Sequence, residues 1–283
     1  MNQNNNRAVA WLLEHLHLSK IKHVKNTENL DEVESTISHR NIIKKKGFLY
    51  KLYLEYYGIF KENTKDIPDG LKIELGSGGG FLKEVITDVI TSDVLELPDV
   101  DKVFFAEKIP YPDESVAAFF LLDTLHHIKE PDKFFSEISR CLKPGAKIIM
   151  IEPTNTLFSR LVFKYIHHEQ FDEKKDEWVV GGTGRLADAN IAMPWIIFSR
   201  DREKFLRKYP DLEILQINKH TPFRMFLSGG LSYRQFVPSY SFEFFTNIEK
   251  LLSPLHNILG SFMTIVIKKQ NDFLFNLKRI VSE

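Results

Sequence analysis

The chain contains a single cysteine, Cys141, among its 283 residues, so an internal disulfide is excluded. So little cysteine is typical of a reducing compartment, and we expect a cytoplasmic location. The N-terminal stretch MNQNNNR lacks the apolar segment of a signal peptide, and no apolar run is long enough to span a bilayer. We therefore expect no transmembrane segment.

Neither sign of charge is in excess, because Lys plus Arg and Asp plus Glu both number 38. Such a chain has no overall basic field of the kind that binds nucleic acid, so no nucleic-acid partner is expected. Hydrophobic residues make up 43% and charged residues 27%, which is typical of a globular protein. The length suffices for one large domain with additional segments.

One stretch, residues 71–81, combines a strand pattern with a cluster of glycines. Apolar residues alternate with polar ones over LKIEL, which predicts a strand at 71–76. Four of the next five residues are glycine, and FLKEVI then predicts a helix that runs to about Ile86. A glycine turn that opens a helix presents backbone N–H groups to a ligand. The same pattern also fits an ordinary structural turn.

Strands and helices alternate after this turn. Further strands are predicted at 88–94, 102–106, 116–125 and 146–153, with an amphipathic helix at 130–142. The segment at 116–125 is apolar throughout, which is typical of a strand buried on both faces of a parallel sheet. Helices at 156–168 and 201–210 and strands at 212–222 and 261–269 follow. This order favours an open, mostly parallel α/β sheet with helices on both faces.

The remaining segments lie outside this α/β pattern. A short helix is predicted at 9–18, and one or two amphipathic helices, interrupted near Gly47, at 28–60. The predicted organisation is an N-terminal helical cap at 1–65, a domain at 66–270 and a C-terminal tail at 271–283. Residues 154–198 and 223–259 are predicted to be insertions at the site.

The glycine stretch and four later motifs resemble one family. The sequence from Glu74 to Gly80, ELGSGGG, resembles the E/D-x-G-x-G-x-G signature of class I S-adenosylmethionine-dependent methyltransferases. The end of the second strand at Asp93, the segments 106–113 and 123–128, and LKPG at 142–145 resemble later motifs of that family, in the same order. The resemblance covers residues 70–153. It implies a doubly wound, seven-stranded sheet with an antiparallel last strand, S-adenosylmethionine as cofactor, and methyl transfer.

The resemblance also implies roles for individual residues. Glu74 corresponds to the acid that accepts from the cofactor ammonium, and Asp93 to the acid that binds the ribose hydroxyls. Phe105 stands where many relatives have an acid for the adenine amine, so it is expected to pack on the ring beside the Ala106 backbone. Arg40 either clamps the cofactor carboxylate or belongs to a solvated helix face. The expected cofactor-binding residues are Glu74, Gly76, Ser77, Gly78, Gly80, Asp93, Phe105, Ala106, Glu107, Asp123 and Arg40.

Two histidines follow the fourth predicted strand. The spacing from Asp123 to His127 resembles that of phosphobase methyltransferases, which implies a catalytic role for His127 as a general base. The alternative is that His126 and His127 only pack or form local hydrogen bonds. The pair at 167–168, with Asp172, suggests a metal, but no third ligand accompanies it at a metal spacing, so no metal site is expected.

The aromatic segment 223–259 bears on the acceptor. It can wall a pocket for an apolar or aromatic small molecule, form a homodimer contact, rest on a membrane or lipid, or add to the core. Two other functions stay open: an S-adenosylmethionine-binding module without catalysis, and a nicotinamide-dependent oxidoreductase. The oxidoreductase is disfavoured because Phe81 occupies the third glycine position of the G-x-G-x-x-G pattern.

Overall fold

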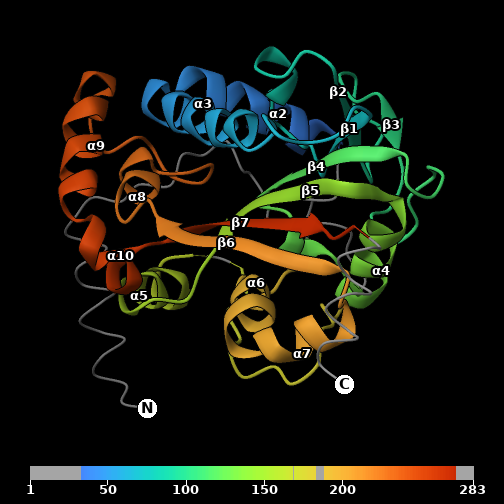
Figure 1. The fold of residues 1–283 in the computed structure, drawn as a ribbon. Helices are drawn as coiled ribbons and strands as arrows, with labels where there is room; N and C mark the ends of the chain where they lie inside the picture. The colour runs from blue at the N-terminus through green and yellow to red at the C-terminus, as the bar shows by residue number, and fades with distance from the viewer. Residues whose placement is uncertain (1–32, 168, 183–187, 272–283) are drawn as a thin grey trace.

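The computed structural model of the protein describes residues 33–167, 169–182 and 188–271. Its centre is a seven-stranded sheet with the order β3-β2-β1-β4-β5-β7-β6 (Figure 1). Neighbouring strands are parallel except β7, which runs antiparallel to β5 and β6. The strands are β1 (Leu71–Leu75), β2 (Val89–Asp93), β3 (Lys102–Val103), β4 (Val116–Leu122), β5 (Leu142–Pro153), β6 (Leu212–His220) and β7 (Phe262–Lys269).

Helices cover both faces of this sheet, which confirms the predicted doubly wound, three-layer α/β class (Figure 1). They are α2 (Val33–Lys45), α3 (Gly47–Glu62), α4 (Pro131–Cys141), α5 (Leu157–Tyr165), α6 (Met193–Trp195), α7 (Arg202–Lys208), α8 (Arg224–Ser228), α9 (Phe242–Leu251) and α10 (His256–Leu259). Single 3₁₀ turns occur at Leu82–Glu84, Leu125–His127, Ser239–Ser241 and Ser253–Leu255, and a π turn at Ile196–Arg200.

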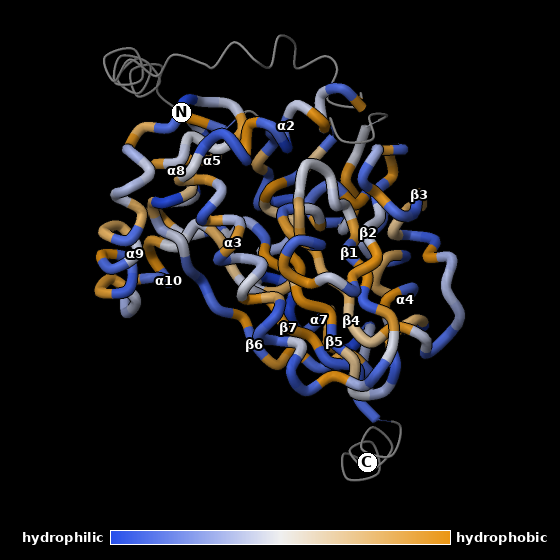
Figure 2. The backbone as a smooth tube through the Cα atoms, turned by 90° about the horizontal axis from the view of Figure 1, so that it is seen from above, coloured by the Kyte–Doolittle hydropathy of each residue, from blue (hydrophilic) through white to orange (hydrophobic). Residues whose placement is uncertain are grey.

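The central strands are hydrophobic along almost their whole length. Residues Val116–Leu121 of β4 are all buried, as expected for a parallel strand covered on both faces. Figure 2, which views the molecule from above, shows hydrophobic stretches gathered around β4, β5 and β7. One face of these strands packs against α4, α6 and α7 in a single core.

Helix α3 covers the opposite face, where it shares a core with residues of β2, β4, β5 and β7 (Figure 1). Its apolar side faces the sheet because Phe48, Leu52, Tyr56 and Phe60 recur at helical spacing, and all four are fully buried. Lys46 separates α3 from α2. One or two helices interrupted near Gly47 were predicted, and the structure has two.

The prediction of a helix after the glycine turn is wrong. The structure has only a 3₁₀ turn, Leu82–Glu84, between β1 and β2. Thirteen residues (76–88) join these two parallel strands. A parallel crossover needs a dozen or more residues in all, and the glycine turn already uses five of them. The eight residues that remain form only the 3₁₀ turn, and the buried side chains of α3 pack against Phe81, Leu82 and Ile86 in the same layer.

Other boundaries differ from the predicted ones by a few residues. Strand β3 has two residues where five were predicted, β4 ends at Leu122, and β5 begins directly after α4 at Leu142. The predicted helix at 9–18 and nearly all of the predicted tail at 271–283 lie outside the described residues. The predicted domain boundaries at 65 and 270 stay predictions.

The segment 223–259 forms α8, α9 and α10 at one end of the sheet, close to α5 (Figure 1). It leaves several large apolar side chains exposed: Tyr240, Phe244, Leu251, Leu255 and Ile258. Its predicted roles as pocket wall, homodimer contact or lipid contact remain predictions. Within the described residues, no helix has both the length and the apolar character needed to span a membrane.

The hydroxyl of Tyr57 on α3 ties this helix to the glycine turn. It accepts a hydrogen bond from the backbone N–H of Phe81 at 3.0 Å, and both residues are buried. We predict that Tyr57→Phe lowers the free energy of unfolding by about 1–3 kcal/mol, because the buried N–H loses its partner. Urea denaturation measures this change. The control is Tyr240→Phe, which removes a hydroxyl from a residue that is 85% exposed; equal stability of both variants and wild type would contradict the prediction.

Candidate functional site

The strand order reverses between β1 and β4, and this point defines a crevice at the carboxyl ends of the strands. In open α/β sheets, ligands bind at such a position. Three loops meet there: the glycine turn after β1, the loop after β2 that begins at Asp93, and the 3₁₀ turn Leu125–His127 after β4. The structure therefore brings the main predicted site residues to one edge of the sheet.

The glycine turn has a backbone that only glycine adopts readily. Gly76 and Gly78 have φ of 68° and 47°, in the left-handed region. A Cβ on Gly76 would lie 2.4 Å from Cγ2 of Thr124, so the turn packs directly against the loop after β4. A Cβ on Gly78 would meet nothing nearer than 3.9 Å, so at this position bare backbone borders open space. A ligand can lie against that backbone.

Asp93 is joined to this turn. Its Oδ2 accepts a hydrogen bond from Gly78 N at 2.8 Å, and its Oδ1 accepts one from Leu95 N at 3.0 Å. Burial raises the pKa of the Asp93 carboxyl, while these two N–H donors act in the opposite direction. Each oxygen of a carboxylate can accept more than one hydrogen bond, so Asp93 can still take hydroxyl donors.

Glu74 is a buried carboxyl directly before the turn, with 2% of its surface exposed. Its Oε2 accepts a hydrogen bond from Ser77 Oγ at 2.7 Å, so the predicted site residue Ser77 contacts Glu74. Burial raises the pKa of Glu74 to about 7, and the carboxylate of Asp93 adds to the rise. No Lys or Arg among the described residues forms an ion pair with Glu74. A cationic ligand group would satisfy this carboxyl.

Arg40 on α2 lies on the glycine turn. Its Nη2 donates to the carbonyl of Gly80 at 2.8 Å, and its Nη1 pairs with Asp99. A Cβ on Gly79 would lie 2.8 Å from Arg40 N, so α2 and the turn are in close contact. The buried Nε of Arg40 has no hydrogen-bond partner among the described residues. Arg40 thus holds the turn, and its expected contact with a cofactor carboxylate remains a prediction.

Three predicted site residues in the loop after β3 have different surroundings. Phe105 is 54% exposed, so its side chain is accessible to a planar ring. Ala106 is half-buried. The carboxylate of Glu107 accepts from the backbone N–H of Lys129 at 3.2 Å, so it fixes the loop before α4.

The loop after β4 is held by Glu152, which the sequence analysis did not identify. Oε1 of Glu152 accepts from the N–H groups of Thr124 and Leu125, and Oε2 lies 3.0 Å from His126 Nδ1. Both His126 and Glu152 are buried. Burial alone would lower the pKa of His126, but the carboxylates of Glu152 and Glu169 raise it well above its usual value. Asp123 begins this loop with φ of 56°, in the left-handed region.

Glu169, also missed, approaches both histidine rings. Its Oε2 lies 3.4 Å from His126 Nε2, and its Oε1 lies 3.7 Å from His127 Nε2. The two rings lie with their centroids 4.2 Å apart. We call His126, His127 and Glu169 the histidine cluster. One signal for this cluster is present in the sequence, the acid directly after the histidines at 167–168. Because it lies some forty residues from His127, the sequence alone does not indicate the contact.

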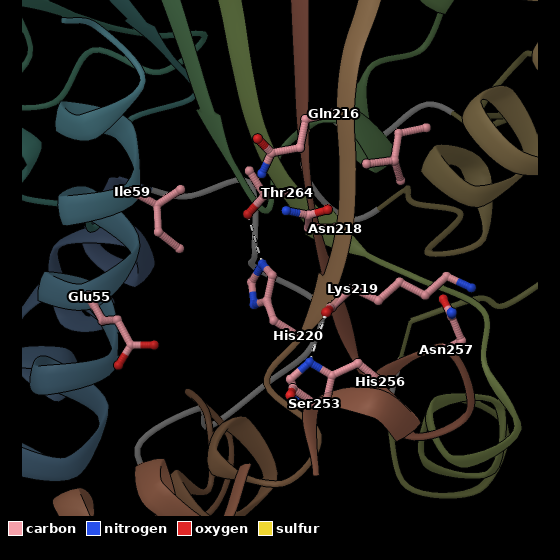
Figure 3. A pocket seen from close by; sticks show the side chains of 11 residues that line it. Glu55, Ile59, Gln216, Asn218, Lys219, His220, Ser253, His256, Asn257 and Thr264 are labelled. Carbon is pink, nitrogen blue, oxygen red and sulfur yellow. Dashed lines mark hydrogen bonds between the residues drawn. The ribbon is translucent and has the colours of Figure 1, made fainter. Parts of the chain in front are cut away.

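A cavity of about 610 Å³, which we call the second cavity to distinguish it from the crevice, lies between α3, β6 and the segment around α10 (Figure 3). Only Ile59 and Ile217 of its lining are apolar. His220 points into it and contacts Thr264 Oγ1 through Nε2 at 2.9 Å. Burial lowers the pKa of His220 to about 3, so this ring is neutral. The part of 223–259 that lines this cavity is polar, unlike the predicted aromatic pocket wall.

Comparison with known proteins agrees with this geometry. Residues 102–150 match a family model described as a methyltransferase domain. An S-adenosylmethionine-dependent methyltransferase of Thermotoga maritima shares the fold with a TM-score of 0.50 and 17% identity, over 83% of this chain and 99% of that one. No curated protein matches.

Two further solved structures show weaker likeness. The geranyl diphosphate C-methyltransferase of Streptomyces coelicolor has a TM-score of 0.46 and 15% identity, over 78% of this chain and 77% of its own. A Bacillus halodurans protein described as a methyltransferase has a TM-score of 0.44 and 13% identity, over 76% and 99%. Residues 102–150 are thus similar to a methyltransferase domain, and the fold is similar to that of a solved methyltransferase, in agreement with the resemblance.

The pKa of Glu74 gives a prediction for stability. The folded protein keeps a proton on Glu74 up to about pH 7, whereas the unfolded chain releases it near the usual value of 4.5. The stability of wild type relative to Glu74→Gln is therefore greatest below pH ~4.5 and falls as the pH rises through ~7, by on the order of 3 kcal/mol. Urea unfolding of both proteins from pH 4.5 to 8 measures this difference.

The control for this measurement is Glu130→Gln, since Glu130 forms an exposed ion pair with Lys133. Its stability should stay parallel to that of wild type through the same pH range. Parallel curves for Glu74→Gln as well would show that the Glu74 carboxyl is not held protonated in the fold.

Proposed function

We propose that the protein is an S-adenosylmethionine-dependent methyltransferase that acts on a small-molecule acceptor. The observation that carries this proposal is the buried carboxyl of Glu74, which has no ion-pair partner among the described residues and stands at the base of the glycine turn, next to Asp93. A cofactor with an ammonium, a sulfonium and two ribose hydroxyls supplies the groups that these carboxyls bind.

The same geometry argues against a dinucleotide. Pyrophosphate sites in α/β folds use the N-terminus of the helix that follows the glycine turn. Here that helix is replaced by a three-residue 3₁₀ turn, and the crevice contains Glu74, Asp93 and Asp123. Such a crevice favours a cationic ligand over an anionic one.

The described residues fit the cofactor as follows. Glu74 would accept from its ammonium, the backbone of 76–80 would lie along its methionine and ribose, and Asp93 would accept from its ribose hydroxyls. Phe105 would pack on the adenine beside Ala106, and Arg40 would reach the carboxylate from α2. When bound, S-adenosylmethionine supplies a methyl group on a positively charged sulfur.

The chain itself orients the reactants and excludes water, which accounts for most of the catalysis in such a reaction. The cofactor would supply its methyl group to an acceptor atom held in line with the carbon–sulfur bond, with the electron pair of that bond left on sulfur. Where the acceptor must also lose a proton, His127 would accept it; the greater exposure of its ring, compared with that of His126, supports this role. The segments 154–198 and 223–259 would select the acceptor.

Calorimetric titration with S-adenosylhomocysteine tests the proposal. We predict one site per chain for this compound and no binding of NADH. Asp93→Asn should weaken S-adenosylhomocysteine by about tenfold or more, because a hydrogen bond to a charged acceptor contributes about 1.5–3 kcal/mol.

Asp88→Asn is the matched control, because Asp88 precedes β2 and forms an ion pair with Lys72 at the opposite edge of the sheet. Its affinity should equal that of wild type. Binding of NADH in place of S-adenosylhomocysteine would support an oxidoreductase and overturn the proposal. Cofactor binding without transfer of label to any compound of a cell extract would support a binding module without catalysis.

The role of His127 is tested with the acceptor that such labelling identifies. We predict that His127→Ala lowers kcat by about 100-fold or more, as expected for loss of a general base, and leaves the affinity for S-adenosylhomocysteine unchanged. The matched variant is His256→Ala, whose ring lies in the second cavity. Full turnover of His127→Ala would remove His127 from the catalytic mechanism.

A further inference from the structure

The two rings of the histidine cluster are oriented by oxygen atoms behind them. His126 Nδ1 lies 3.0 Å from Oε2 of Glu152, and His127 Nδ1 lies 3.3 Å from the backbone carbonyl of Asp188. Each Nδ1 is thus placed to donate its proton to an oxygen, which leaves Nε2 as the atom through which each ring can bind an ion in place of a proton. A histidine that binds a metal is typically held in this way, by a carboxylate or a carbonyl on its other nitrogen.

Both Nε2 atoms face the same carboxylate. They lie 3.4 and 3.7 Å from the two oxygens of Glu169, and the ligand atoms of the three residues lie within 4.8 Å of one another. Metal bonds of about 2.0–2.2 Å in a tetrahedral site place neighbouring ligand atoms about 3.4 Å apart. One ion can therefore contact all three side chains after small side-chain movements.

We propose that His126, His127 and Glu169 bind a divalent transition-metal ion of the zinc type. Two imidazole nitrogens and one carboxylate favour such an ion over Mg²⁺ or Ca²⁺, which prefer oxygen ligands. Three protein ligands leave at least one coordination position for water or for a substrate atom. Glu152 is a positioning residue in this site, because it contacts only the far nitrogen of His126.

The cluster forms because three separate parts of the chain meet at one edge. His126 and His127 lie in the 3₁₀ turn after β4, Glu152 lies near the end of β5, and Glu169 follows α5. Parallel pairing of β4 and β5 brings their carboxyl ends together, with Leu122 opposite Ile151. No metal site was expected from the sequence, because no third ligand lies near 167–168 at a metal spacing. The ligands proposed here come from separate parts of the chain.

A bound ion also deepens the proposed function, on which this step rests. It would hold an oxygen atom of the acceptor in its open position and lower the pKa of that oxygen, so that the acceptor loses its proton more readily. His127 would then act as a ligand, and the ion would perform the task otherwise assigned to a histidine base. Removal of the metal separates these two roles of His127.

The experiment uses the full chain, freed of metal by a chelator, and titrates it with Co²⁺ by visible absorption and with Zn²⁺ by calorimetry. We predict one ion per chain. Glu169→Gln and His127→Asn should each weaken binding by about tenfold or more, the scale seen on disturbing such sites. Glu130→Gln, the same chemical change in an exposed ion pair, should bind like wild type. Unchanged S-adenosylhomocysteine affinity shows that each variant is folded.

Several outcomes would overturn the inference. These are no binding of Co²⁺ or Zn²⁺ by wild type, equal binding by wild type and Glu169→Gln, or binding of Mg²⁺ in preference to Zn²⁺. Because metal binding is measured without the cofactor, and the cofactor analogue is titrated without metal, failure of one proposal leaves the other standing. Methyl transfer that persists in the chelator would assign His127 the base role and overturn the catalytic role of the ion.

Discussion

The short connection between β1 and β2 is the constraint on which the rest of the site depends. Thirteen residues must leave the end of β1, form the glycine turn and return to the start of β2. They contain no α-helix, so the sheet at this point needs a cover from elsewhere. Helix α3, which precedes β1 in the chain, supplies it with a row of buried aromatic side chains. The hydrogen bond from Phe81 N to Tyr57 then fixes the turn to that helix.

The absence of a helix directly after the glycine turn, in a layer covered by α3, also affects the electrostatics of the crevice. A helix that begins at the glycine turn would direct the positive end of its dipole toward the ligand. Without it, the ionisable groups near the turn are the carboxyls of Glu74 and Asp93, and the guanidinium of Arg40 beside Gly80. Two acids and one arginine suit a ligand with both a cationic and an anionic end, such as an amino acid moiety, better than they suit a diphosphate.

The fold could be predicted from the sequence because its signals are local. Apolar strands such as 116–122 and glycines that require positive φ, such as Gly76 and Gly78, identify themselves within a few residues. The prediction of a helix at 81–86 was wrong because it rested on local helix propensity alone. Propensity does not take account of the length of the connection to β2. Glu152 and Glu169 were missed for a related reason, since only the pairing of β4 with β5 and the path of 154–198 bring them to His126.

The segment after β5 would therefore have two linked tasks under the proposed function. It was expected to select the acceptor, and the structure shows that it also provides Glu169 and the carbonyl of Asp188 to the histidine cluster. Asn190 N further donates to the carbonyl of His126, so the segment holds the backbone of the loop after β4 as well. A change of acceptor through substitutions in 154–198 would alter the positions of these oxygens. Under the proposed function, the specificity and the chemistry of the acceptor side would thus be coupled by the same stretch of chain.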